Sequence, residues 1–171
     1  MDTWHTTYLD PSTRILIYDG LLIEYAPGCV IEADLARYTE FRANAVARLL
    51  SPKYTAVSRT ALWIHTGFLY PDSMPRLCSA HPHSSQSHVV SRRAMRADCC
   101  QTISGLHVAI PACTAFELLL RESPQDAWQG ISALYDTHLV TPQEITEHIN
   151  KDSARNGSRR VRATFEELSR K

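Results

Sequence analysis

A mixed fold of the α/β (α+β) class is predicted by three features of this 171-residue sequence. An Asp-Gly pair at 19–20 separates two short apolar runs, which is a strong signal for a β-hairpin. The stretch from Cys99 to Arg121 joins two extended runs through Gly105 and continues into a helix that begins at Pro111. Beyond it, apolar residues recur at helical spacing. We expect an N-terminal β-hairpin, a small mixed or antiparallel sheet, and C-terminal helices packed on that sheet.

The N-terminal region carries the hairpin signal. The apolar runs 15–18 and 21–25 flank the Asp-Gly pair, so they are expected to pair as strands. Pro27-Gly28 predicts a further turn, and a short strand is expected at 29–31. The residues before this unit show no periodicity and are expected to form a tail. The predicted division of the chain is a tail at 1–13, a β-hairpin at 14–32 and an α/β domain at 33–171.

The middle of the chain alternates between helical and extended patterns. Residues 34–50 are expected to form a helix, and a shorter helix follows Ser58, whose hydroxyl is expected to be the N-cap, and ends at Gly67. Polar residues at 84–87 mark the expected tip of a loop between strands. The inward face of the first helix is predicted to consist of Tyr38, Phe41, Ala45, Val46 and Leu49. The expected strands are 76–80, 88–91 and 99–103.

The C-terminal half carries clear signals for the start of each helix. The helix that begins at Pro111 is apolar on most of its surface, so it must be buried. A Ser-Pro pair at 123–124 predicts the start of the next helix, and residues 141–144 form a capping box with proline at the first helical position. An Asn-Gly pair at 156–157 precedes the last helix. The predicted core is centred on Phe116, Leu119, Ile131, Leu134 and Phe165.

Composition and charge restrict the possible functions. Hydrophobic residues make up 44% and charged residues 21% of the chain, as in an ordinary soluble globular protein. The formal net charge is zero, so binding to nucleic acid or to a membrane would need a local excess of charge. The N-terminus has no signal-peptide pattern, and no apolar run is long enough to span a bilayer. The five cysteines lack framework spacing, so we expect a cytoplasmic protein.

Thiol and imidazole side chains gather between residues 78 and 100, where they offer ligands that zinc accepts. Alternation along a strand puts Cys78 and the following histidines on opposite faces, so no metal site is expected. The neighbouring Cys99 and Cys100 should also face opposite sides, one buried and one partly exposed, which disfavours a redox pair. The potential ligands are Cys78, His81, His83, His88, Cys99 and Cys100.

The remaining histidines form no catalytic pattern. His65, His107, His138 and His148 occupy helix or strand positions where a hydrogen-bonded structural histidine is expected. The sequence has no Gly-x-Ser-x-Gly elbow and no glycine-rich phosphate loop before a helix. We therefore expect a protein without catalytic residues and without a cofactor.

Arginines form two basic groups in the second half of the chain. From residue 151 to the end there are seven basic and three acidic residues, an excess of +4, whereas residues 1–50 carry four basic and seven acidic residues, a balance of −3. Because the apolar stripe of the last helix faces the core, its arginines lie on the outer face, either as solvated residues or as phosphate contacts. The candidates for contact with nucleic acid or a partner are Arg92, Arg93, Arg96, Arg155, Arg159, Arg160 and Arg162.

Several of these stretches resemble one family of bacterial proteins. Residues 105–118 follow the pattern Gly-Leu-x-Val-x-x-Pro-Ala-x-Thr-Ala-x-Glu-Leu, and residues 139–144 read Leu-Val-Thr-Pro-x-Glu. Both patterns, with Gly-Cys-Val-Ile at 28–31, are similar to the C-terminal domain of AbiEi-type antitoxins and their actinobacterial relatives. The resemblance covers about residues 21–168. Family members usually carry Arg at the position of Cys113 and Asp at that of Glu117, which implies that any ion pair between these positions is absent or altered here.

The resemblance also implies a function. Members of the AbiEi-type family counteract a nucleotidyltransferase-like toxin of a type IV toxin–antitoxin system through their C-terminal domain. They repress their own operon through a winged helix that precedes this domain. The strand pair at 14–32 corresponds to the wing, but too little sequence precedes it here for the three helices of a DNA-reading module, so we expect a wing remnant. Many relatives continue into a nuclease domain that this chain is expected to lack.

Two functions remain open at this point. The first is a non-catalytic antitoxin-like protein or transcriptional-regulator relative, with weak contact to DNA phosphates through the C-terminal arginines and a nucleotidyltransferase-like toxin as its functional counterpart. The second is a protein-interaction module, or a relic of a mobile element, that does not bind DNA. Neither involves a membrane or a metal, and the sequence does not fix the oligomeric state.

Overall fold

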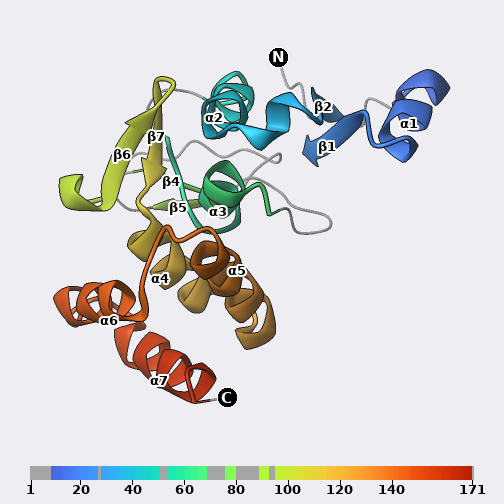
Figure 1. Ribbon diagram of the computed structural model, residues 1–171. Coiled ribbons are helices and arrows are strands. Elements are labelled where there is room, and N and C mark those ends of the chain that lie inside the picture. Colours follow the sequence, from blue (N-terminus) through green and yellow to red (C-terminus); the bar gives the residue numbers. More distant parts are fainter. Residues whose placement is uncertain are drawn as a thin grey trace.

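The computed structural model describes residues 9–26, 28–50, 54–68, 76–79, 89–92 and 95–170, with 76–79 and 89–92 described as backbone. Helices and two small sheets form the expected mixed fold, with α1 and the β1–β2 hairpin at one end and α6 and α7 at the other (Figure 1). The helices are α1 (Pro11–Tyr18), α2 (Thr39–Ala47), α3 (Ser58–Thr66), α4 (Pro111–Arg121), α5 (Pro124–Asp136), α6 (Pro142–Lys151) and α7 (Ser158–Leu168). The strands are β1 (Leu22–Ala26), β2 (Cys29–Glu32), β3 (Thr55–Ala56), β4 (Arg76–Ser79), β5 (Val89–Arg92), β6 (Cys100–Ile103) and β7 (Leu106–Ala109). None of the described helices is long and apolar enough to cross a membrane.

The expectation of a strand at 15–18 was wrong, because these residues belong to α1. The Asp10 carboxylate accepts hydrogen bonds from the backbone N–H groups of Ser12 and Thr13, and Pro11 occupies the first helical position. This cap satisfies backbone N–H groups that the first turn of a helix leaves without an intrahelical partner, so it favours the helix. The hairpin consists instead of β1 and β2, which pair antiparallel around the predicted turn at 27–28.

The helix expected at 34–50 is divided in two. A 3-10 turn at Leu35–Arg37 ends at Tyr38, whose backbone is extended, and α2 begins at the next residue. Tyr38 and Phe41, predicted to face inward, are 59% and 47% exposed, whereas Arg42 is buried. The Arg42 guanidinium donates hydrogen bonds to the backbone oxygens of Ala36, Ile64 and His65. Val46 is buried as predicted, but the buried side of α2 is rotated toward Arg42 and Ala43, which the apolar pattern did not indicate.

The larger sheet has five described strands in the order β5-β4-β3-β7-β6. It is mixed, because β3 pairs parallel to β7 and β4 pairs parallel to β5, while the other pairs are antiparallel. Strands close to the expected 76–80, 88–91 and 99–103 are thus confirmed. The predicted loop tip at 84–87 lies outside the described residues.

Helix α3 follows β3 and ends at Gly67, which has the positive φ expected of a C-cap. Ser58 is not its N-cap: Val57 holds that position without a side-chain bond, and the Ser58 hydroxyl donates to Glu122 Oε1 at 3.0 Å. This hydroxyl therefore links α3 to the segment after α4 instead of capping its own helix.

Two groups of buried apolar residues meet at α4, which carries buried residues without interruption from Cys113 to Leu119. The first, here called the helical cluster, contains all five residues predicted to form the core. The helical cluster consists of Leu62, Ala115, Phe116, Leu118, Leu119, Ala127, Ile131, Leu134, Val140, Ile145, Ile149, Val161 and Phe165. The second, the sheet cluster, consists of Ala43, Val46, Ala56, Val57, Ala61, Trp63, Ile64, Cys99, Leu106, Val108, Ala109 and Cys113.

The start signals of the C-terminal helices are confirmed. The Ser123 hydroxyl accepts a hydrogen bond from the Asp126 backbone N–H, and Thr141 and Glu144 form a reciprocal capping box. Hydrogen bonds from Thr141 hold the pKa of the Glu144 carboxyl below its ordinary value. Each signal satisfies helix N–H groups over a few residues, so local sequence predicts it well.

Gly157 connects α6 to α7 with a φ of +89°, and a Cβ there would lie 2.5 Å from Leu120 Cδ1. We expect Gly157→Ala to lower the free energy of unfolding by about 2 kcal/mol, from backbone strain and from displacement of Leu120. Gly105→Ala is the matched control, because Gly105 has a φ of +79° but nothing within 4 Å of its ideal Cβ. Urea denaturation measures both variants, and equal losses would show that the Leu120 contact contributes nothing.

Candidate nucleic-acid or partner interface

Helix α7 turns its apolar side inward and its arginines outward. Val161 and Phe165 are buried, whereas Arg159, Arg160 and Arg162 are exposed. Within the described part of the chain, none of these three arginines forms a salt bridge. Their side chains are therefore available on the outer face of α7 and on its two flanks.

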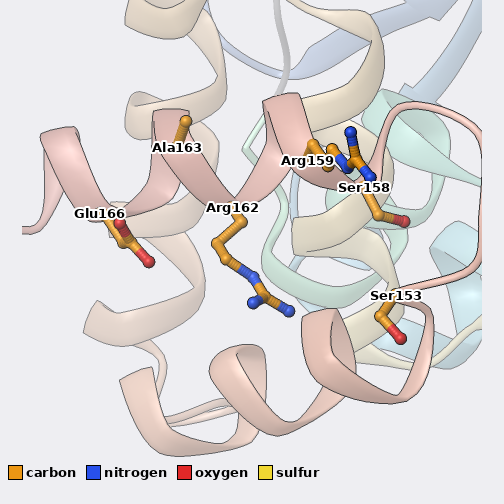
Figure 2. A pocket seen from close by; sticks show the side chains of 6 residues that line it. All are labelled: Ser153, Ser158, Arg159, Arg162, Ala163 and Glu166. Carbon is orange, nitrogen blue, oxygen red and sulfur yellow. The ribbon is translucent and has the colours of Figure 1, made fainter.

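A hollow of about 300 Å³ lies between α7 and the segment that follows α6, and Figure 2 shows the side chains around it. Arg162 reaches across toward α6, where it donates a hydrogen bond of 2.9 Å to Asn150 Oδ1. Arg160 instead donates to the backbone oxygen of Leu120, at the end of α4. Arg159, Arg162 and the Ser153 hydroxyl can supply hydrogen-bond donors to an anion at this hollow, whereas the Ser158 hydroxyl donates to the Asp152 backbone oxygen. Its lining residues are Ser153, Ser158, Arg159, Arg162, Ala163 and Glu166.

Arg155 is not part of this exposed surface. Its guanidinium contacts Glu117 Oε1 at 2.7 Å and Asp152 Oδ2 at 3.5 Å, and it lies 4.4 Å from the centre of the Phe116 ring. Arg121 contacts the other oxygen of Glu117 at 2.8 Å. The Glu117 side chain is completely buried. The Glu117 carboxylate is thus paired with two arginines, and its pair with Arg155 connects α4 to the segment before α7.

Of the three remaining candidate arginines, the structure describes the side chain of Arg96 only. Arg96 forms ion pairs with Asp98 at 2.9 Å and with Asp152 at 2.5 Å. The Arg96 guanidinium holds the pKa of the Asp98 carboxyl below its ordinary value. Arg92 ends β5, whose backbone alone is described, and Arg93 lies outside the described residues. The structure thus brings Arg96 and Arg155 together at Asp152, apart from the exposed arginines of α7.

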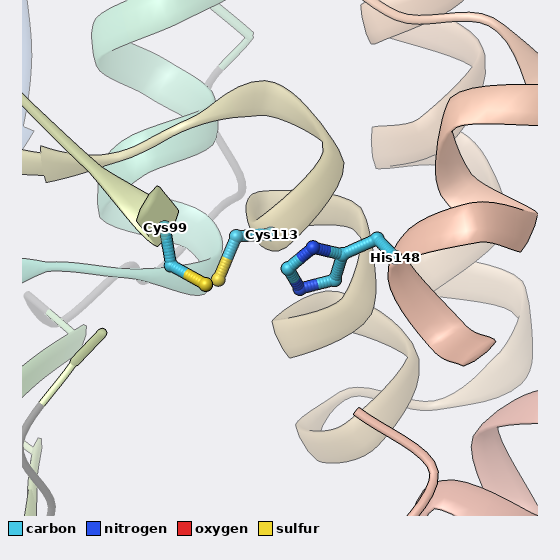
Figure 3. A group of neighbouring side chains, drawn as sticks. All are labelled: Cys99, Cys113 and His148. Carbon is cyan, nitrogen blue, oxygen red and sulfur yellow. The ribbon is translucent and has the colours of Figure 1, made fainter. Parts of the chain in front are cut away.

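A second arrangement of chemically reactive side chains lies in the interior. The Cys99 and Cys113 sulfurs and a ring nitrogen of His148 all lie within 4.8 Å of one another, and all three residues are buried (Figure 3). Cys113 donates a hydrogen bond to Cys99 that holds the Cys99 pKa below its ordinary value, and the charge of Arg96 acts in the same direction. Burial lowers the pKa of His148, which keeps the ring neutral near pH 7.

This interior cluster differs from the set weighed in the sequence. Cys99 is buried and Cys100 is partly exposed, as expected. The side chain of Cys78 is not described, and His81, His83 and His88 lie outside the described residues. Cys113 and His148 reach Cys99 from α4 and α6, so no local spacing in the sequence relates the three residues.

Comparison with family models places the chain in a known family. The family model for the AbiEi antitoxin C-terminal domain matches residues 5–167, nearly the whole sequence. Comparisons with curated proteins and with solved structures give no match. The family match confirms the resemblance predicted for residues 21–168 and extends it toward the N-terminus, to residues that include α1. The chain belongs to the AbiEi antitoxin C-terminal domain family.

Proposed function

We propose that this protein is the non-catalytic antitoxin of a bacterial toxin–antitoxin pair, and that it acts in the cytoplasm against a nucleotidyltransferase-like toxin. The observation that carries the proposal is the family match over residues 5–167. Co-expression with the toxin of its own pair tests it, and we expect this chain to restore growth. Growth arrest that persists beside soluble, folded protein would overturn the proposal.

We further propose that α7 contacts the phosphate backbone of DNA without reading its sequence. Arg159, Arg160 and Arg162 are exposed on α7, and Arg159 and Arg162 line a hollow together with the exposed Ser153. Phosphate oxygens accept hydrogen bonds from arginine and serine, and such contacts position a protein without giving specificity. Arg96 and Arg155 support this surface indirectly, because their ion pairs with Asp152 and Glu117 hold the segment before α7 in place.

The salt dependence of DNA binding measures these contacts. For two phosphate contacts, affinity for duplex DNA is expected to fall roughly tenfold between about 50 and 200 mM salt. The double variant Arg159→Ala/Arg162→Ala should bind more weakly, with a slope of log affinity against log salt that is smaller by about two. The matched control is Arg14→Ala/Arg37→Ala, which removes two exposed arginines near the opposite end of the molecule. Fluorescence anisotropy with two unrelated DNA sequences provides the readout.

A protein-interaction module without DNA binding is the second candidate, because apolar side chains are exposed near the N-terminus. Ile15, Tyr18 and Leu21, in or just after α1, are 59%, 91% and 58% exposed, and Tyr38 and Phe41 form a second exposed pair with ring centres 6.1 Å apart. Exposed apolar residues that lie together are typical of protein interfaces. If DNA binding is absent even at low salt, phosphate contact is wrong and this second candidate is favoured.

A further inference from the structure

We propose that Cys99, Cys113 and His148 bind a divalent metal ion of the zinc class, at a site distinct from the arginine surface. Their ligand atoms come from three separate places: the end of a 3-10 turn before β6, the first turn of α4, and the last turn of α6 (Figure 3). All three lie within 4.8 Å of one another. Zinc bonds are about 2.3 Å to sulfur and about 2.0–2.1 Å to nitrogen, so small side-chain movements bring three such atoms onto one ion.

The imidazole of His148 gives an independent indication of a ligand. Its side chain is 7% exposed, and its Nε2 atom has no hydrogen-bond partner among the described residues. A buried polar nitrogen without a partner is costly, and a bound metal or a hydrogen bond formed on metal binding would satisfy it. Imidazole nitrogen is among the commonest metal ligands in proteins.

The charges at the site suit a divalent ion. Metal binding would release one proton from each thiol, and the two resulting thiolates balance the two positive charges of the ion. Two thiolates and an imidazole are ligands that zinc accepts, whereas calcium and magnesium prefer oxygen. Asp152 Oδ2 lies 3.9 Å from His148 Nε2, so this carboxylate, which also pairs with Arg96 and Arg155, is placed to orient the ring.

The position of the site gives the metal a structural role. Cys99 and Cys113 belong to the sheet cluster, and the His148 ring packs at 5.7 Å against Phe116 of the helical cluster. An ion held by all three residues would therefore join the sheet to α4 and α6. Loss of the ion should loosen this junction, with no requirement that the antitoxin activity itself involve a metal.

Cobalt substitution tests the site in the full chain. Reduced, metal-free protein is titrated with Co²⁺, which in a tetrahedral thiolate site gives intense visible bands and a sulfur-to-cobalt charge-transfer band. We expect one equivalent to bind, Zn²⁺ to displace it, and Zn²⁺ to raise the midpoint of thermal unfolding. Loss of a residue that only hydrogen-bonds to a metal ligand weakens metal affinity roughly 10- to 100-fold. Cys113→Ser and His148→Gln remove ligands themselves, so each should weaken cobalt binding by at least this factor. Asp152→Asn should shift the visible bands while the charge-transfer band remains.

Cys29→Ser is the matched control, because Cys29 lies on β2 in the separate N-terminal hairpin and its loss should leave cobalt binding unchanged. Unaltered binding by Cys113→Ser or His148→Gln would place the metal elsewhere, for example at Cys78 and the histidines that follow it, and would overturn the proposal. If these variants do not fold, the cobalt spectrum and the thermal unfolding of the wild-type protein are the test. Absence of the charge-transfer band and of any Zn²⁺ stabilisation, or isolation of a Cys99–Cys113 disulfide whose reduced form binds no metal, would also overturn it.

Discussion

Glu117→Gln is expected to lower the free energy of unfolding by about 3 kcal/mol. The carboxylate is completely buried and pairs with Arg121 at 2.8 Å and with Arg155 at 2.7 Å. Removal of its charge leaves two guanidinium groups, 25% and 15% exposed, without the negative charge between them. Their partial exposure keeps the expected loss at the lower end of the range for a broken buried pair.

Urea denaturation measures this loss, and the matched control is Glu147→Gln on the exposed side of α6. The control makes the same chemical change where no burial is involved, so its effect should stay within about 0.5 kcal/mol. Equal stability of the two variants would mean that the Glu117 pairs do not hold α4 to the segment before α7.

Arg42→Ala is expected to cost about 3 kcal/mol or more, because it leaves several buried carbonyl groups without a donor. The guanidinium donates to Ala36 at 2.5 Å, to Ile64 at 2.9 Å and to His65 at 3.0 Å. These oxygens belong to the 3-10 turn before α2 and to the end of α3, so one side chain joins two elements. Arg42→Lys should recover little of the loss, because an ammonium group lacks the planar fork that reaches all three oxygens.

The control for this prediction is Arg48→Ala, which removes an exposed arginine just after the same helix. Arg48 donates one hydrogen bond to Asn44, so its loss should cost less than about 0.5 kcal/mol. Chemical denaturation of the three variants, with hydrogen exchange of the α3 backbone, gives the comparison. Similar stability of Arg42→Ala and Arg48→Ala would show that water replaces the guanidinium without cost.

The parts of the fold that were predicted correctly depend on interactions between residues close in sequence. Pro111 at the first position of α4, the Ser123 cap and the Thr141–Glu144 capping box each act within one helical turn. The wrong prediction of a strand at 15–18 also came from local signals, because two of them conflict there. Asp10 and Pro11 mark a helix start, but the apolar run 15–18 resembled a strand because it stands before an Asp-Gly pair.

The interior polar contacts could not be predicted, because they join distant residues. Arg155 reaches Glu117 across 38 positions and Arg42 reaches Ile64 across 22, and no local pattern indicates which charged residue turns inward. The cluster of Cys99, Cys113 and His148 forms in the same way, when α4 and α6 pack beside the start of β6. By contrast, the outward position of the α7 arginines follows from its apolar stripe, so this part of the candidate site was predicted from periodicity.

The growth of bacteria that express the toxin of this pair together with the antitoxin tests the central claim most directly. We predict that the wild-type chain restores growth, whereas cells that carry the toxin without this chain stay arrested. Failure of the folded wild-type chain to restore growth would contradict the antitoxin function itself.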